Sequence, residues 1–387
     1  MNSPMSLASR QTALDILLDI EKGPSTLDQR MDRFHCQSRF DRRDEAFVTA
    51  LVYGVLRWRG RLDGIIAELS RTPLPRMDRR VRNILRIGLY QILYMDRVPD
   101  SAAVATSVDL TKQLGKEWLS GFVNAVLRNA LRRLPDIAHP TPGKSGIAEL
   151  AMVHSMPDWL LQRWIDDWGM AETNAMCHAI NRIPLLTVRT NTLKIDRASL
   201  IVALERLADK VDPTPLAPDG IILDALKESL FESPAFEKGW FQVQDEAAQA
   251  VSYLLDPQPG QNVLDACAGL GGKTAHTAAL MANKGTIMAL DRDARKLRKL
   301  DQELKRLGIG IVSSQAVDLQ KATLPSHDRG RFDRILLDAP CSGLGVIRRN
   351  PDTKWTHTPQ DIERCAAKQK QLLHILAPFL SPGGILV

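Results

Sequence analysis

The first third of the chain carries apolar residues at the spacing of an α-helix and shows no strand-like alternation. The positions that define two such helical faces are Ala13, Ile16, Leu17 and Ile20, and Val81, Ile84, Leu85 and Gly88. Proline-containing segments at 73–75 and 99–101 interrupt the pattern, and Ser101 is placed to cap the helix that follows. A last helix is expected from Leu119 to about Leu134. This pattern predicts an all-α domain over residues 1–142.

The next part of the chain mixes the two periodicities. Residues 139–146 have the proline, glycine and serine content of a linker. The elements expected after it are an amphipathic helix from Pro157, a strand at 185–191, a helix at 199–207 and short strands at 221–223 and 240–243. We therefore predict a linker helix followed by a small, RRM-like α+β module over residues 143–235.

From about Gln244 short apolar strands alternate with helices, which is typical of a parallel α/β sheet. The strands expected here cover 262–265, 286–291, 311–316 and 335–338, and the helices cover 274–282, 292–307 and 359–376. A fifth strand begins at Gly384 and is cut off at Val387. We expect a Rossmann-like domain over residues 236–387 that is incomplete at its C-terminus, and hence a fragment of a longer protein.

Bulk composition is ordinary for a globular protein and argues against a membrane protein. Of the 387 residues, 44% are hydrophobic and 25% are charged, and no apolar run approaches the roughly 18 residues that span a bilayer. The N-terminus lacks the apolar core of a signal peptide. Five cysteines without a CxxC pair argue against a disulfide scaffold and against structural zinc. We expect a cytoplasmic protein with reduced thiols and no bound metal.

The formal charge of +6 is carried by the N-terminal part of the chain. Residues 1–142 contain 22 Lys and Arg against 16 Asp and Glu, whereas the remainder is balanced at 29 of each. One stretch is crowded with arginines: Arg71, Arg76, Arg79, Arg80, Arg82 and Arg86. Guanidinium groups suit bidentate contact with phosphates, although a solvated helix face explains such a cluster equally well. The asymmetry favours an anionic polymer as partner.

Carboxylates mark the ends of the expected parallel strands. Four strands end in, or are followed at once by, Asp265, Asp291, Asp318 and Asp338. The turn after the first strand consists of Cys267, Ala268, Gly269, Leu270, Gly271, Gly272 and Lys273. Glycines let backbone approach a ligand closely, and the following helix offers free N–H groups. Because ligands bind at the carboxyl ends of parallel strands, these features predict a nucleotide-type cofactor site in which Asp291 accepts ribose hydroxyls.

The glycine turn alone fits a nicotinamide site, an S-adenosylmethionine (SAM) site or a plain tight turn. Two features favour SAM. The spacing is not the GxGxxG that a pyrophosphate requires, and Asp318 and Asp338 offer polar contacts for an adenine and a methionine amine. A GxxxxGK[ST] phosphate loop does not fit, because Cys267 occupies the position of its first glycine.

Candidate chemistry is concentrated in D-A-P-C-S-G at 338–343, which follows the apolar run 332–337. Asp338 and Cys341 leave the same strand three residues apart, and Pro340 stiffens the turn between them. A thiol held in this way suits attack on, or elimination from, an electron-poor ring, whereas an isolated cysteine is more often a small hydrophobe. Lys273 and Lys354 are candidates for a cation that favours a thiolate, although either also fits a surface or phosphate-binding lysine.

Several motifs together resemble the NOL1/NOP2/Sun RNA cytosine-C5 methyltransferases. They are V-Q-D-E-A-A at 243–248, D-A-C-A-G at 265–269 with K-T at 273–274, D-A-P-C-S-G at 338–343 and R-R-N-P-D at 348–352. The helical N-terminus, with G-F-V-N-A-V-L-R at 121–128, resembles the NusB-like RNA-binding domain. The combination is similar to the bacterial RsmB/Sun branch, whose members methylate 16S ribosomal RNA.

This resemblance implies a cofactor, a mechanism and a set of site residues. SAM contacts are implied at Cys267, Ala268, Gly269, Leu270, Gly271, Gly272, Lys273, Asp291, Asp318 and Asp338, with Leu270 replacing the proline common in the family. Cys341 matches the cysteine that releases product from a covalent cysteine–C6 adduct, and Asp338 could act as an acid near N3. The nucleophilic cysteine follows the fifth strand in the family, so it is expected beyond Val387.

Other functions remain open on the sequence alone. Cys341 could itself be the nucleophile, as the Pro-Cys cysteine is in DNA cytosine-C5 enzymes, and a preference for DNA would support that. An RNA-binding assembly factor without turnover would bind cofactor without methyl transfer. A nicotinamide dehydrogenase leaves the D-A-P-C motif unused. The leading prediction is a monomeric SAM-dependent enzyme that acts on a single-stranded or looped cytosine of 16S ribosomal RNA.

Overall fold

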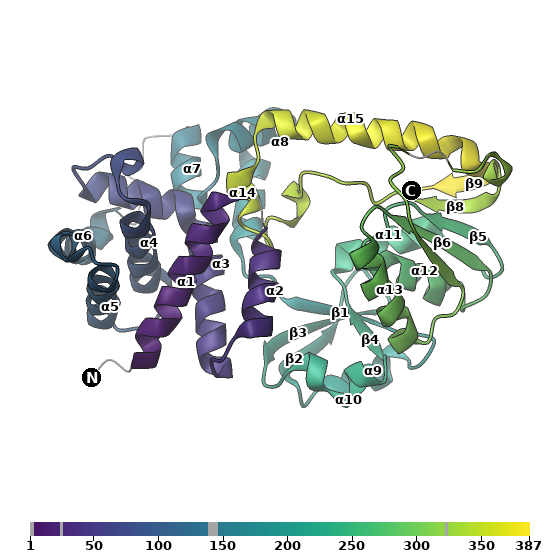
Figure 1. The fold of residues 1–387 in the computed structure, drawn as a ribbon, viewed down its shortest axis with the longest axis horizontal. Coiled ribbons are helices and arrows are strands. Elements are labelled where there is room, and N and C mark those ends of the chain that lie inside the picture. Colours follow the sequence, from purple (N-terminus) through teal and green to yellow (C-terminus); the bar gives the residue numbers. More distant parts are fainter. Residues whose placement is uncertain (1–3, 24–25, 138–145, 322–323) are drawn as a thin grey trace. The chain divides into compact units, whose positions relative to one another are not determined.

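The computed structural model describes residues 4–23, 26–137, 146–321 and 324–387, and its chain divides into two compact units (Figure 1). The first unit comprises Met1–Ile183 and Gly343–Pro359, and the second comprises Pro184–Ser342 and Gln360–Val387. The segment Gly343–Pro359 therefore belongs to the first unit, although it follows the D-A-P-C-S-G motif directly in sequence. The predicted linker at 139–146 lies outside the described residues, apart from Gly146.

The first unit is helical, as the periodicity predicts. Its longer helices are α1 (Pro4–Lys22), α2 (Leu27–Gln37), α3 (Arg42–Leu69), α4 (Arg79–Tyr94), α5 (Asp100–Gln113), α6 (Glu117–Ile137), α7 (Ile147–His154) and α8 (Asp158–Asn181), and α14 (Thr353–Thr356) is one turn. Both predicted apolar faces enter one core, which α3 and α6 also line. The predicted cap at Ser101 is wrong: α5 begins at Asp100, and Pro99, whose ring fixes φ, occupies the N-cap without a side-chain hydrogen bond.

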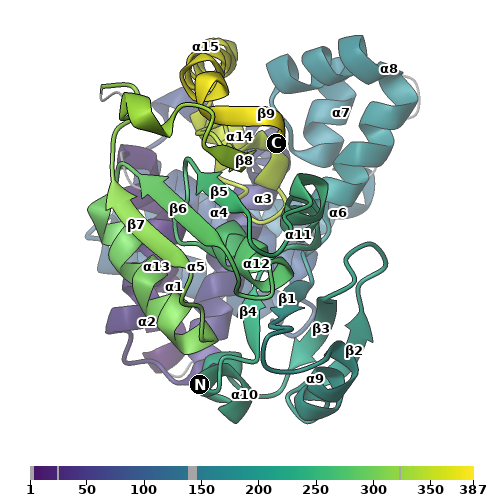
Figure 2. The same cartoon turned by 90° about the vertical axis from the view of Figure 1, so that its right-hand side faces the viewer.

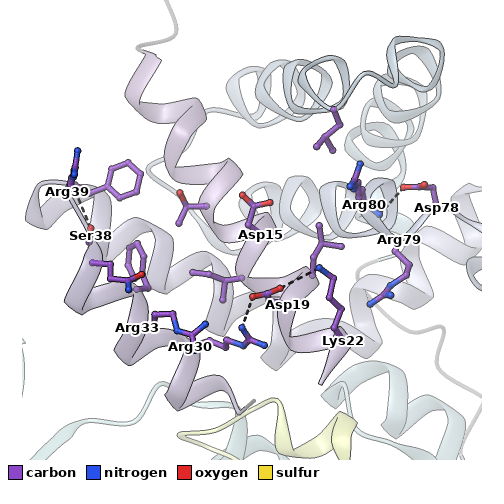
Figure 3. A pocket seen from close by; sticks show the side chains of 17 residues that line it. Asp15, Asp19, Lys22, Arg30, Arg33, Ser38, Arg39, Asp78, Arg79 and Arg80 are labelled. Carbon is purple, nitrogen blue, oxygen red and sulfur yellow. Dashed lines mark hydrogen bonds and ion pairs between the residues drawn. The ribbon is translucent and has the colours of Figure 1, made fainter. Parts of the chain in front are cut away.

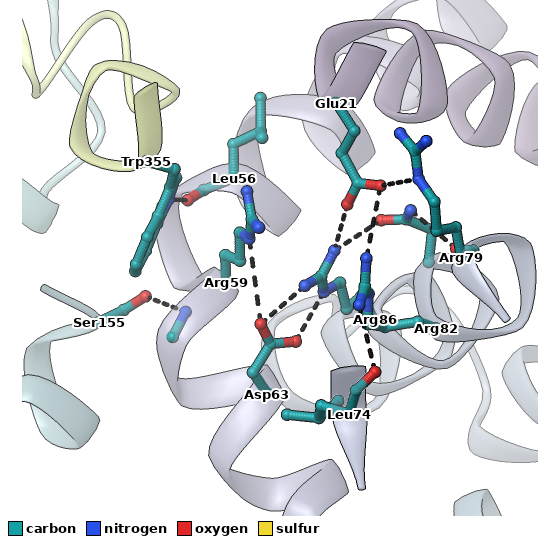
Figure 4. Close-up of polar contacts among 12 residues, drawn as sticks. Glu21, Leu56, Arg59, Asp63, Leu74, Arg79, Arg82, Arg86, Ser155 and Trp355 are labelled. Atoms are coloured by element: carbon teal, nitrogen blue, oxygen red, sulfur yellow. Dashed lines mark hydrogen bonds and ion pairs between the residues drawn. The ribbon is translucent and has the colours of Figure 1, made fainter. Parts of the chain in front are cut away.

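The predicted arginine cluster is divided between the interior and the surface of this unit (Figure 4). Arg86 is buried, donates to both oxygens of Asp63 at 2.7 Å and contacts Glu21 at 2.8 Å. Arg79 and Arg82 also lie within 4 Å of Glu21. The members that are exposed and make no side-chain hydrogen bond or ion pair with the described residues are Arg71, Arg76 and Arg80. The interpretation as a solvated helix face is therefore wrong for Arg86, because its guanidinium group is buried and paired with Glu21 and Asp63.

The second unit begins with a four-stranded antiparallel sheet. Its elements are β1 (Leu186–Thr190), α9 (Arg197–Leu204), β2 (Ala208–Pro213), β3 (Gly220–Leu226), α10 (Pro234–Glu237) and β4 (Phe241–Val243), with strand order β2-β3-β1-β4. Strand β2 was not expected from the sequence, because it is an edge strand whose charged residues leave only Ala208 buried. Val188, Leu204 and Phe241 lie in the core beneath the sheet, which has the α+β character predicted for this part.

A five-stranded parallel sheet follows in the order β7-β6-β5-β8-β9 (Figure 2). The elements are α11 (Glu246–Leu255), β5 (Asn262–Asp265), α12 (Gly272–Leu280), β6 (Thr286–Asp291), α13 (Ala294–Leu307), β7 (Val312–Ala316), β8 (Phe332–Leu336), α15 (Pro359–Leu376) and β9 (Leu380–Leu386). Strand order reverses between β5 and β8, which is where an open α/β sheet binds its ligands. The predicted Rossmann-like sheet is present.

Alternate strand residues face two helical layers. Val263 and Leu336 pack with residues of α12 and α13, whereas Leu264 and Ile335 pack with Leu376 of α15. Strand β9 starts four residues earlier than predicted. Its first half contains the sequence S-P-G-G at 381–384, and proline and glycine have low strand propensity, so this half was not recognised. No helix among the described residues has the length and apolar character needed to cross a membrane.

Candidate active site

The glycine turn joins β5 to α12 at the point where the strand order reverses. Gly269 and Gly271 have φ of 58° and 83°, a region that favours glycine. A Cβ on Gly271 would lie 2.7 Å from Cγ of Leu300, so close packing also requires glycine there. A Cβ on Gly269 would meet nothing within 4 Å, which leaves open space above the turn. The turn thus presents bare backbone and the N-terminus of α12 to a ligand.

Three carboxylates surround the turn. Asp291 accepts hydrogen bonds from the backbone N–H of Gly269 at 2.9 Å and of Asp293 at 2.8 Å. Asp265 is buried, accepts from Thr274 at 2.6 Å through one oxygen, and has no hydrogen-bond partner for the other among the described residues. Burial raises the pKa of Asp265 to about 6, with Asp338 contributing in the same direction. Asp265 is thus a further carboxylate of the predicted cofactor site, in addition to Asp291 and Asp338.

The electrostatics of the turn also decide the state of Cys267. Burial, assisted by the negative charges of Asp265, Asp291 and Asp338, raises the pKa of its thiol to about 12. The thiol is therefore protonated at neutral pH and unsuited to nucleophilic attack. Cys267 therefore enters the site as a neutral thiol beside the carboxylates of the turn.

Lys273 joins the two motifs that the sequence places 65 residues apart. It lies in the first turn of α12, and its Nζ is 2.5 Å from Oδ2 of Asp338. Asp338 follows the end of β8 and is about half exposed. The glycine turn and the D-A-P-C-S-G motif therefore meet, as their positions at strand ends predict. The ammonium group of Lys273 is directed to this carboxylate.

A cavity of about 540 Å³ opens beside Asp338. Its lining includes Asp338, Ala339 and Cys341 from the motif, residues of α15, and Leu386 and Val387. Gln369 of α15 donates to the carbonyl of Pro340 at 3.3 Å and so ties the motif to that helix. The thiol of Cys341 is exposed. The structure thus brings Asp338 and Cys341 to one cavity, at the carboxyl edge of β8 and β9.

Asp318 stands apart from the other predicted residues. It follows β7, accepts from the backbone N–H of Gln320 at 3.1 Å and lies 3.8 Å from Nζ of Lys321. No hydrogen bond or ion pair connects its side chain to the glycine turn or to Asp338 among the described residues. A cofactor that spans β5 and β7 would be needed to link them, so its role stays a prediction.

The sequence did not predict a role for Arg189, whose side chain hydrogen-bonds to the end of the glycine turn. This side chain on β1 is fully buried, and it donates to Oε1 of Gln244, to Oε1 of Gln242 at 3.0 Å and to the carbonyl of Gly272 at 2.9 Å. Gln249 donates in turn to the carbonyl of Gln244 at 3.0 Å. The small sheet is thereby fastened to the start of α12. Arg189 lies within a strand of otherwise mostly apolar residues, so its own surroundings in the sequence do not mark it as functional. The only indication was that its partner Gln244 belongs to the family motif at 243–248.

The segment after Cys341 is held by the helical unit. Lys354 is 1% exposed and donates to the carbonyls of Arg57 and Ser155 at 2.7 and 2.9 Å. Burial, and secondarily Arg57, lowers the pKa of Lys354 to about 7. Trp355 donates from Nε1 to the carbonyl of Leu56 at 2.7 Å (Figure 4). Lys354 is thus neither a surface lysine nor a phosphate-binding lysine, so these two of the three sequence interpretations of this residue are wrong, and its role as a cation beside a thiolate is not supported by any contact with Cys341 among the described residues.

Other contacts fasten the same segment. Asp352 accepts from the backbone N–H of Leu27 at 3.2 Å at the start of α2, and Asn350 donates to Asp28 at 3.0 Å. Arg57 donates to the carbonyl of Arg348 at 2.9 Å. The R-R-N-P-D motif at 348–352 therefore serves as a structural anchor on α2 and α3.

Three family models match this chain. They are described as the NusB family over residues 7–132, the RsmF/B-like ferredoxin-like domain over 156–227, and 16S rRNA methyltransferase RsmB/F over 252–387. A Synechocystis protein named "Probable ribosomal RNA small subunit methyltransferase B" is 38% identical over 98% of this chain and 85% of its own length. The chain belongs to the RsmB/F methyltransferase family. The family resemblance drawn from the sequence is confirmed.

Solved structures agree with this assignment. The crystal structure of PH0851 is 26% identical with a TM-score of 0.78, covering 100% of this chain and 85% of that one. NSun6 from Pyrococcus horikoshii with SFG, a SAM analogue, is 25% identical with a TM-score of 0.53, covering 60% of this chain and 83% of that one. The predicted fold class is confirmed, whereas the domain boundaries at 142 and 235 stay predictions.

Proposed function

We propose that this RsmB/F family member methylates C5 of a cytosine in 16S ribosomal RNA, with SAM as methyl donor. The observation that carries the proposal is the contact between Lys273 and Asp338. It places the glycine turn, which fits a cofactor, against the cavity that contains Cys341. Membership of the methyltransferase family and the similarity to a protein solved with a SAM analogue support it.

The residues around the turn fit SAM in shape and charge. The open space above Gly269 leaves room for a ligand on the backbone, and the carboxylates match the hydroxyl and amine donors of such a ligand. The residues that we assign to the cofactor are Cys267, Ala268, Gly269, Leu270, Gly271, Gly272, Lys273, Asp291, Asp318 and Asp338. When bound, SAM supplies an electrophilic methyl group. Asp291 would hold ribose hydroxyls while remaining bonded to the backbone of the turn.

The chemistry that the protein must supply is activation of a weak nucleophile. A thiolate that adds to C6 of cytosine makes C5 electron-rich enough to take a methyl group. The C5 proton then leaves, and its electron pair expels the thiolate from C6. Cys341 would accept that proton or pass it on, and Asp338 would serve as an acid near N3. Leu386 and Val387, at the end of β9, line the same cavity as Asp338 and Cys341.

RNA recognition falls to the whole chain in this proposal. Cytosine C5 is inaccessible in a helix, so the target base must be looped or flipped into the cavity. The NusB-family domain, which carries the excess of basic residues, would bind the surrounding RNA. We propose a monomer that acts on ribosomal RNA in the cytoplasm.

The test is transfer of a labelled methyl group from SAM to 16S RNA by the full-length protein, followed by nucleoside analysis. We expect 5-methylcytidine, and loss of the product with Asp338→Ala but not with Asp256→Ala, an exposed carboxylate after α11. Methylation at another atom would overturn the C5 assignment. SAM and RNA binding with no transfer to naked RNA or to assembling subunits would instead favour an assembly factor without turnover.

A further inference from the structure

The buried guanidinium group of Arg189 is satisfied differently from that of Arg30 in the helical unit. The little-exposed side chain of Arg30 lies 2.6 Å from its partner carboxylate, Asp19 (Figure 3). Arg189 is 1% exposed, and its acceptors are two glutamine side chains and the carbonyl of Gly272, none of which carries a charge. Because a buried charge is costly unless an opposite charge compensates it, Arg189 needs a carboxylate at longer range.

Asp219, at the end of the β2–β3 connection, supplies that carboxylate. Its main-chain carbonyl accepts a hydrogen bond at 2.8 Å from the N–H of Thr190, the residue after Arg189. Its side chain is 18% exposed, and Oδ2 accepts from the hydroxyl of Tyr253 at 2.6 Å. Burial lowers the pKa of Arg189 to about 10, and the negative charge of Asp219 is the largest of the influences that oppose this lowering. Asp219 is therefore the counter-charge of the guanidinium group.

His276 of α12 also faces Asp219 but does not neutralise it. The ring is 0% exposed, and its Nε2 lies 3.9 Å from Oδ2 of Asp219. Burial lowers the pKa of His276 to about 4, so the ring is neutral at neutral pH. Burial would raise the pKa of Asp219, but contacts with His276 and Tyr253 and the charge of Arg189 outweigh it and hold this pKa below its ordinary value. Asp219 therefore stays ionised, and the buried cation that it faces is Arg189.

Further contacts fix the β2–β3 connection on α11. Glu246, in the first turn of that helix, accepts from the backbone N–H groups of Leu216 and Ala217 at 2.6 and 3.0 Å. Tyr253, which holds Asp219 itself, lies about two turns further along the same helix. The carboxylate is thus held in a defined position beside α11 and α12.

We infer that Asp219 is a positioning residue for the cofactor turn, because its carboxylate compensates the charge of the guanidinium group that holds the carbonyl of Gly272. The inference rests on the proposed function, since it takes SAM to bind at that turn. Asp219 acts through Arg189 and does not touch the ligand. The small antiparallel sheet thereby contributes to SAM affinity through a charge on one of its connections.

The test measures the Kd of S-adenosylhomocysteine, the demethylated form of SAM, for the whole chain by calorimetry at pH 7.5 and 9.5. Asp219→Asn keeps an oxygen that can accept from Tyr253 and removes only the charge. At pH 7.5 its Kd should exceed that of wild type by at least about threefold. At pH 9.5 the ratio of the two Kd values should be at least about fivefold larger again, because Arg189 without its counter-charge loses its proton at a lower pH.

Two substitutions serve as controls. Asp224→Asn removes an exposed carboxylate of β3 and should leave the Kd within about twofold of wild type at both pH values. Asp219→Glu restores a negative charge, so the ratio of its Kd to that of wild type should be the same at both pH values. A ratio for Asp219→Asn that does not change with pH would overturn the inference, because a purely structural contact has no titrating charge. A wild-type Kd in that variant would overturn it as well.

The other titratable groups that face Arg189 must not cause the expected pH dependence. His276 titrates far below pH 7.5, and Glu303 of α13 is the same in both proteins. Tyr253 remains, because burial and the charge of Asp219 both raise the pKa of its phenol, and the substitution removes that charge. The Kd ratio of Asp219→Asn/Tyr253→Phe to Tyr253→Phe should therefore also rise with pH. A ratio that stays constant would assign the titration to Tyr253 and overturn the inference.

Amide hydrogen exchange separates the failure of this inference from that of the proposed function, because it needs no ligand. Residues 271–275, at the start of α12, should exchange faster in Asp219→Asn than in wild type and Asp224→Asn. Tyr253→Phe, which removes a hydrogen bond of the carboxylate but not its charge, should give a smaller increase and replaces Asp219→Asn if that variant does not fold.

Two outcomes distinguish the proposals. If wild type binds neither SAM nor S-adenosylhomocysteine, the cofactor assignment fails, and faster exchange in Asp219→Asn still supports the link between Asp219 and the turn. Wild-type exchange in Asp219→Asn, together with a wild-type Kd and normal methylation, would overturn the inference and leave the proposed function standing.

Discussion

The side-chain nitrogen of Lys354 lies 2.9 Å from the main-chain carbonyl oxygen of Ser155, inside the helical unit. A second carbonyl, that of Arg57, lies 2.7 Å from the same nitrogen. A neutral amine has two N–H groups and can satisfy both carbonyls, so the contact does not require a charge. Burial and Arg57 both lower the pKa of Lys354, which reaches about 7, and the thiol of Cys177 opposes them weakly. This lysine therefore anchors the segment after Cys341 as a hydrogen-bond donor.

The lowered pKa of Lys354 gives the fold a specific pH dependence. In the unfolded chain a lysine titrates near 10.4, so between about pH 7 and 10 the unfolded state holds a proton that the folded state has lost. Stability from this group is thus fully present above pH 10 and is lost as pH falls through about 7. Thermal unfolding of wild type and Lys354→Met at pH 6, 8 and 9.5 should show wild type gaining on the variant as pH rises, by on the order of 3 kcal/mol.

Two neighbours must be considered in that comparison. Burial lowers the pKa of His154, which titrates below this window, and burial raises the pKa of Cys177 to about 11. Cys177 titrates inside this window only in the unfolded chain, at about 8.5, and because that contribution is common to wild type and variant it cancels from their difference. A constant difference between wild type and Lys354→Met across this range would show that Lys354 is charged in the fold.

The site and the anchor differ in how far sequence could predict them. The proximity of Asp291 and Asp338 to the glycine turn was predictable because parallel strands bring their carboxyl ends to one edge, which follows from topology alone. The anchoring role of Lys354 could not be predicted, because its partners are main-chain carbonyls of α3 and of the residue after α7, which leave no side-chain pattern in the sequence. Arg86 was misjudged for a related reason, since Asp63 and Glu21 lie on other helices.

Gly60 of α3 is required by the anchor. A Cβ at this position would lie 2.9 Å from Cη2 of Trp355 and 3.3 Å from Cα of Ser155, so Gly60→Ala must displace the indole. We expect a loss of about 1–3 kcal/mol in the free energy of unfolding. Gly121→Ala in α6 is the matched control, because a Cβ there meets nothing within 4 Å.

The control should move in the opposite direction. Alanine lowers the backbone entropy of the unfolded chain and favours helix, so Gly121→Ala should stabilise by about 0.5–1 kcal/mol. Urea unfolding of both variants measures the two effects. An absence of destabilisation by Gly60→Ala would contradict the close contact with Trp355.

Arg189 should affect the affinity for SAM indirectly, because it holds the glycine turn to which we propose that SAM binds. Its guanidinium holds the carbonyl of Gly272 and Gln244, so Arg189→Met leaves both without their buried donor and loosens the turn. We expect the Kd for SAM, measured by calorimetry, to rise at least about tenfold, since one lost buried hydrogen bond is worth about 1–3 kcal/mol. Arg298→Met on the exposed face of α13 is the control and should bind as wild type does.

For Arg189→Met, a loss of SAM affinity must be distinguished from a loss of folding stability. Arg189→Lys keeps the charge but has a single donor nitrogen in place of the guanidinium fork, so its Kd for SAM should fall between those of wild type and Arg189→Met. If Arg189→Met unfolds at the wild-type temperature and binds SAM with the wild-type Kd, the turn does not depend on this residue.

Cys341 offers the sharpest test of the proposed chemistry, because its removal should trap the reaction rather than prevent it. If a thiolate elsewhere in the full-length protein attacks C6 and Cys341 serves only in release, Cys341→Ala will accumulate a covalent protein–RNA adduct in the presence of RNA and SAM. The adduct is measured as a shifted band on a denaturing gel. Cys365→Ala, a half-buried thiol of α15 outside the cavity lining, should give no such band. Absence of the adduct together with loss of methyl transfer would instead make Cys341 the nucleophile, because a protein without its attacking thiol forms no bond to C6.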